Sequence, residues 1–186
     1  MKTLIFTFLL VAFVPFVVTA DTALVFFNEG IGVDPVQGIA TTGSAVPNFV
    51  CGVPPGAAPW RIGSLQAEVD TDGHITVDGR GLLLAGSKGI GTNGGQTVQA
   101  VLFCISPANK CGTPSVTSPT GVPLAANGDF LIDDTLTPLP PLSCTHPVLL
   151  ITQVPANGGA WFAAGIQSPP PTPMPTPGPT PTPAFE

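Results

Sequence analysis

The sequence predicts an all-β protein: an antiparallel β-sandwich, immunoglobulin-like in outline, with about seven or eight short strands and minimal helix. Apolar residues repeatedly alternate with a period of two, as in half-buried strands. No apolar stripe with the helical period of 3.6 residues is sustained. Turns are frequent, because Gly and Pro supply 22 and 24 of the 186 residues.

The two ends of the chain differ from its middle. Lys2 precedes an apolar run of about 15 residues, shorter than the roughly 20 that span a bilayer, and Val18 and Ala20 are small residues before Asp21. We therefore expect residues 1–20 to be a secretory signal peptide; a retained membrane anchor is the alternative. The domain is expected at 21–167, in a secreted or cell-envelope protein.

Residues 168–186 form a Pro/Thr-rich segment in which nine of nineteen residues are proline. Such a composition excludes helix and sheet and favours an extended polyproline II conformation. We interpret the segment as a disordered tail. We expect it to serve as a spacer across a cell wall or as a glycan-bearing stalk; a disordered end without a role is the alternative.

Charge limits the classes of partner. The chain has 5 Lys and Arg against 11 Asp and Glu, a net charge of −6. Nucleic acids and anionic membranes attract clustered basic residues, so neither is an expected partner. We expect no cofactor. The partner itself is unknown, with a cell-wall or surface glycan or another extracellular protein as candidates.

The strands are expected in the following order. Residues 23–27 form a first β-prone run. Residues 65–69 and 75–77 alternate in phase around Asp70-Thr71-Asp72-Gly73, which predicts a β-hairpin. Residues 82–85 are expected to continue its second arm. Further strands are predicted at 98–105, apolar on both faces, and at 129–133, 148–152 and 161–166, with turns at Asn93-Gly94, Asn127-Gly128 and Asn157-Gly158.

Four cysteines predict two disulfides in an exported chain: Cys51, Cys104, Cys111 and Cys144. The short spacing from Cys104 to Cys111 favours a local bridge between them, with Cys51–Cys144 as the second. The pairing 104–144 with 51–111 stays open. No Cys-x-x-Cys pair occurs, so a zinc site is not expected.

Other candidate binding sites can also be explained as ordinary structural features. The spacing of Asp70 and Asp72 resembles part of a calcium loop, yet Gly79 stands where such a loop needs a bidentate Glu. We therefore expect a turn and no metal, with a weak calcium site as the alternative. Trp161 should be buried, whereas Trp60, between Pro59 and Arg61, is the candidate for an exposed binding residue.

The function expected is that of a secreted, non-catalytic module that binds, adheres or supports the cell envelope. The alternative is an extracellular hydrolase in which His74 or His146 acts with nearby carboxylates. The adjacent Asp133 and Asp134 are expected to end a strand, where they would point to opposite faces. No Gly-x-Ser-x-Gly motif supports the enzyme, and both histidines are expected in solvated loops.

Overall fold

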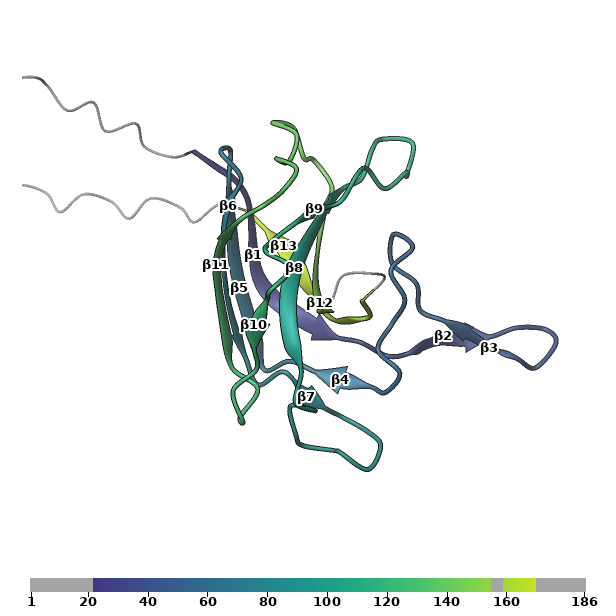
Figure 1. Cartoon of the computed structure of the whole chain (residues 1–186). Coiled ribbons are helices and arrows are strands. Elements are labelled where there is room, and N and C mark those ends of the chain that lie inside the picture. The colour runs from purple at the N-terminus through teal and green to yellow at the C-terminus, as the bar shows by residue number, and fades with distance from the viewer. Residues whose placement is uncertain (1–21, 155–158, 170–186) are drawn as a thin grey trace, which may run out of the picture.

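The computed structural model describes residues 22–154 and 159–169, which contain thirteen β-strands and no helix (Figure 1). The strands are β1 (Ala23–Gly32), β2 (Val36–Ile39), β3 (Ala45–Pro47), β4 (Trp60–Arg61), β5 (Ser64–Asp70), β6 (His74–Arg80), β7 (Leu83–Leu84), β8 (Thr97–Cys104), β9 (Ser115–Val116), β10 (Val122–Pro123), β11 (Phe130–Thr135), β12 (Pro147–Gln153) and β13 (Trp161–Ser168). Several have only two to four residues, too short for the alternation that identified the longer strands.

One large sheet dominates the fold. Its strands follow the order β10-β8-β12-β13-β1-β5-β6-β11, with β9 also paired to β8, and all of these pairings are antiparallel. The sheet curls until its two ends meet, where Val116 and Thr137 exchange backbone hydrogen bonds of 3.0 and 2.9 Å. The predicted all-β, antiparallel class is confirmed. The sheet is nearly closed and barrel-like, and it is not clearly a two-sheet or immunoglobulin-like sandwich (Figure 1).

The predicted hairpin is confirmed. β5 pairs with β6 in a register that places Val69 opposite Ile75 and Leu65 opposite Gly79. Gly73 has a φ of +87°, a conformation that favours glycine, and its N–H donates to the carbonyl of Asp70. The expected extension of the second arm through 82–85 is wrong. The chain turns at Gly81, where φ is +65°, and β7 pairs with β4 in a separate two-stranded sheet.

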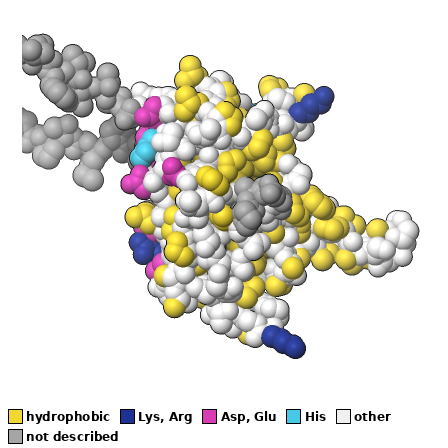
Figure 2. Space-filling view, in the orientation of Figure 1, with side chains coloured by type: hydrophobic (Ala, Val, Ile, Leu, Met, Phe, Trp, Pro, Cys, Tyr) yellow, Lys and Arg dark blue, Asp and Glu magenta, His cyan; other side chains and the backbone are white. Residues whose placement is uncertain are grey.

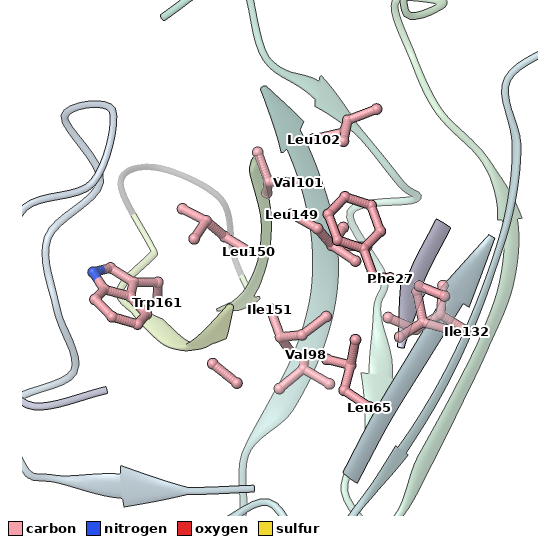
Figure 3. Close-up of a cluster of buried hydrophobic side chains, with 14 of the residues drawn as sticks. Phe27, Leu65, Val98, Val101, Leu102, Ile132, Leu149, Leu150, Ile151 and Trp161 are labelled. Atoms are coloured by element: carbon pink, nitrogen blue, oxygen red, sulfur yellow. The ribbon is translucent and has the colours of Figure 1, made fainter. Parts of the chain in front are cut away.

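The core lies inside the curled sheet. Phe27, Leu65, Ile132 and Leu149 are among the buried side chains that meet there (Figure 3). β8 is buried on both faces, as its sequence predicted. The segment around residues 48–56 lies against β13: the indole N–H of Trp161 donates to the Asn48 carbonyl at 2.9 Å, and Pro55 forms a β-bridge with Trp161.

The second small sheet is a projecting arm. β2 and β3 pair only with each other among the named strands and extend away from the body of the molecule (Figure 1). Val36 and Ile39 on the arm and Phe49 beyond it have exposed side chains. Figure 2 shows this arm as an uncharged projection rich in apolar surface.

The disulfides join Cys51 to Cys111 and Cys104 to Cys144. This is the pairing that the sequence left open, and the preferred pairing of Cys104 with Cys111 is wrong. Cys111 lies opposite Ile105 in an antiparallel bridge. Successive side chains of a strand point to opposite faces, so Cys104 faces away from Cys111 despite their proximity in sequence.

Two disulfides fit an extracellular or otherwise oxidising environment. In residues 22–154 and 159–169, no helix has the length and apolar character needed to cross a membrane. The expected signal peptide, nearly all of the Pro/Thr-rich segment and the Asn157-Gly158 turn lie outside the described residues.

Candidate functional site

The candidate site is built on the outer face of β1, β5, β6 and β11. Alternation directs Leu65, Ala67 and Val69 of β5 into the core, so the intervening residues of this strand face outward. Strand register then aligns outward-facing side chains in two rows across the four strands. One row is Phe26, Glu68, Thr76 and Asp133; the other is Asn28, Gln66, Asp78 and Leu131.

A groove with a volume of about 710 Å³ lies over these two rows. All their members except Asp133 line it, and Ser168 and Pro169, at the end of β13, form part of its wall. Phe26 is half-buried and Leu131 is 63% exposed, so the groove offers apolar surface to solvent at both sides of a polar floor. We call this feature the outer-face groove.

Polar groups on the floor are partly held by one another. The Gln66 side-chain amide donates to Asn28 Oδ1 at 3.2 Å. Arg80 lies with Nε 2.6 Å from Asp78 Oδ1 and with Nη2 2.8 Å from Asp78 Oδ2, which compensates the Asp78 charge. Glu68 is exposed and makes no ion pair with any described residue. The groove therefore carries one uncompensated carboxylate beside amide and hydroxyl groups.

Arg80 also links the groove to the turn before β11. Its Nη1 lies 3.4 Å from Asp129 Oδ2, while the Gly81 N–H donates to Asp129 Oδ1 at 3.0 Å. The hydrogen bond from Gly81, supported by Asn127 and Arg80, lowers the pKa of Asp129 below its usual range. Asp129 therefore stays ionised and fixes the end of β6 against β11.

His74 lies outside the groove, at the start of β6, between two carboxylates. Its Nε2 is 2.9 Å from Asp133 Oδ1, and its Nδ1 is 3.6 Å from Asp70 Oδ2. The hydrogen bond with Asp133, and more weakly the Asp70 carboxylate, raise the pKa of His74 above its ordinary value. Figure 2 shows acidic side chains gathered around a histidine on the side of the molecule where β6 and β11 lie in Figure 1.

This arrangement predicts a pH dependence of stability. A pKa raised by folding means that the contribution of His74 is fully present below about pH 6.5 and is lost as the pH rises through the folded-state pKa. We expect the wild type to gain thermal stability relative to His74→Gln between pH 8 and pH 5.5. The effect should be small, because the side chain is 41% exposed. Melting curves of both proteins measure it, and parallel curves at the two pH values would contradict it.

The two histidines of the hydrolase hypothesis are not brought together. Both ring nitrogens of His74 face carboxylates, which leaves neither directed at a nucleophile. His146 is exposed, and its Nδ1 lies 3.2 Å from the hydroxyl of its neighbour Thr145. Neither histidine lines the outer-face groove.

The turn between β5 and β6, which contains Asp70 and Asp72, is fixed by hydrogen bonds with the backbone and by contact with His74. Asp72 Oδ1 accepts the His74 N–H at 2.9 Å, and Asp70 faces the His74 ring. Across the described part of the chain, no three His, Cys, Asp or Glu side chains are grouped so that they could hold a metal ion. Asp70 and Asp72 thus act in the turn and in the histidine cluster.

The expectation that Trp60 is exposed is wrong. Its side chain is 6% exposed and stacks on Phe162, with ring centroids 4.3 Å apart. β4 alternates like any strand, so the exposed Arg61 beside it implies that Trp60 faces inward. Trp161 is buried, as predicted.

The groove was not predicted from the sequence, although the alternation of polar and apolar residues in the hairpin indicated part of it. Gln66 and Glu68 alternate with the apolar residues of the predicted hairpin, which indicates a polar outer face. Asn28 and Leu131 could not be placed there, because their register with the hairpin depends on strands distant in sequence.

No known protein family model matches this chain, no curated protein matches its sequence, and no solved structure matches its fold.

Proposed function

We propose that the protein is a secreted, non-catalytic module of the extracellular space or cell envelope, and that it binds an extended glycan in the outer-face groove. The observation that carries the proposal is the composition of the groove, in which Asn28, Gln66, Glu68 and Thr76 lie between two apolar side chains. Amides and hydroxyls donate and accept hydrogen bonds, as sugar hydroxyls require. Phe26 offers a ring edge or face for the apolar side of a sugar.

The scaffold supports binding more than chemistry. The groove lies on regular, hydrogen-bonded strands of one sheet, so its backbone framework is in place before a ligand arrives. The hydrolase alternative has the proximity of His74 to Asp133 in its favour. It is weaker because those groups pair with each other outside the groove.

The test is co-sedimentation of the full chain with insoluble cellulose, chitin and peptidoglycan. We expect retention on at least one polysaccharide, and Leu131→Asp should weaken it about fivefold or more, as for a residue contributing about 1 kcal/mol. Leu142→Asp is the matched control, because Leu142 is 79% exposed and does not line the groove.

His74→Ala and His146→Ala should retain binding. The proposal is overturned if none of the three polysaccharides retains the protein, or if both leucine variants bind as well as the wild type. Unchanged melting temperatures of the variants establish that a loss of binding is local.

A further inference from the structure

The inference concerns the same groove and rests on its being a binding surface. β13 ends at the groove: Ser168 pairs with Phe26, and Ser168 and Pro169 both line the groove. The last described residue, Pro169, therefore lies at the wall of the site. From there the sequence reads Pro-Pro-Thr-Pro-Met-Pro-Thr-Pro-Gly through Gly178.

We propose that the outer-face groove binds the proline-rich segment 170–186 of its own chain, which competes with external ligands. Proline-rich chains in the polyproline II conformation dock on apolar and aromatic surfaces. Phe26 and Leu131 supply such surface at the two sides of the groove.

Backbone carbonyls of a proline-rich segment also need donors, since the segment has few N–H groups of its own. Gln66, Asn28 and Thr76 carry donors on the floor of the groove. Charge fits as well. Glu186 is the only ionisable side chain of the segment, so residues 170–185 approach Glu68 and Asp78 without like-charge repulsion.

Length and tethering favour the contact. Seventeen residues of polyproline II extend roughly 50 Å at about 3.1 Å per residue, more than a surface groove of this volume requires. A segment attached at the wall of its site has an effective concentration of the order of millimolar. Weak individual contacts are therefore sufficient to populate the bound state.

Met174 is a suitable reporter, because the chain has only one other methionine, Met1. In full-length protein with labelled methionine methyl groups, Met174→Leu assigns the signal. We expect the Met174 methyl resonance to differ from its random-coil position and to show contacts with the Phe26 ring. Leu131→Asp and Gln66→Ala should move it toward the random-coil position, and Leu142→Asp should leave it in place.

A Met174 resonance at the random-coil position in the wild type overturns the inference. A shift that disappears on dilution assigns the contact to a second copy and also overturns it. Replacing the prolines from 173 to 183 by serine in the full chain should raise apparent affinity for a retained polysaccharide about twofold or more, as expected when a half-populated closed state is removed.

The two proposals fail separately. Polysaccharide retention that depends on Leu131, with a random-coil Met174 signal, retains the glycan function and overturns the docking of the segment. A shifted Met174 signal without retention on any polysaccharide supports the docking of the segment and overturns the glycan function.

Discussion

Replacing Cys104 and Cys144 together by alanine should lower the free energy of unfolding by about 4 kcal/mol, because the bridge closes a loop with a sequence separation of 40. The loss should lower the melting temperature by roughly 10 °C. The Cys51/Cys111 double variant, with a separation of 60, should lose about as much. Thermal or urea unfolding measures both effects, and a stability equal to that of the wild type in either variant would refute the prediction.

The connectivity itself can be mapped without ambiguity. Cleavage after Arg61 and Lys110, together with cleavage before Asp129, separates the four cysteines into different peptides. Under non-reducing conditions the peptide with Cys51 should remain joined to that with Cys111, and the peptide with Cys104 to that with Cys144. A peptide pair joining Cys104 to Cys111 would contradict the structure.

Truncation of the Trp60 side chain should lower the free energy of unfolding about as much as removal of one disulfide. Trp60→Ala removes a buried ring stacked on Phe162 and should lower the free energy of unfolding by about 3–5 kcal/mol. Trp60→Phe preserves an aromatic ring against Phe162 and should cost much less.

Phe49→Ala is the matched surface control for this experiment. Phe49 is an aromatic side chain that is 55% exposed, so its truncation should change stability by no more than about 0.5 kcal/mol. Urea unfolding of the three variants compares the losses. Equal effects of Trp60→Ala and Phe49→Ala would show that Trp60 is not part of the core.

Local features of the fold could be predicted from sequence. Leu65, Val69 and Ile75 alternate on both sides of a turn that contains Gly73, so the hairpin is specified within a few residues. The burial of β8 on both faces is likewise visible in its continuous apolar run.

Long-range features could not be predicted in the same way. The stacking of Trp60 on Phe162 joins strands about a hundred positions apart, and no pattern near Trp60 indicates its partner. The pairing of Cys104 with Cys111 was wrongly predicted because of one detail of register. Ile105, and not Cys104, lies opposite Cys111, so the Cys104 side chain points to the other face. From sequence, the groove could be inferred only through outward-facing residues of the hairpin, such as Gln66, Glu68 and Thr76, because β1 and β11 join the hairpin through pairings that only the folded chain defines.

The position of β13 has a consequence for how the protein is made. β13 is the last strand in the described chain, yet it lies in the middle of the sheet and pairs with both β1 and β12. A growing chain that has not reached Ser168 leaves β1 and β12 each with an open edge. The sheet therefore cannot be completed until β13 has been synthesised.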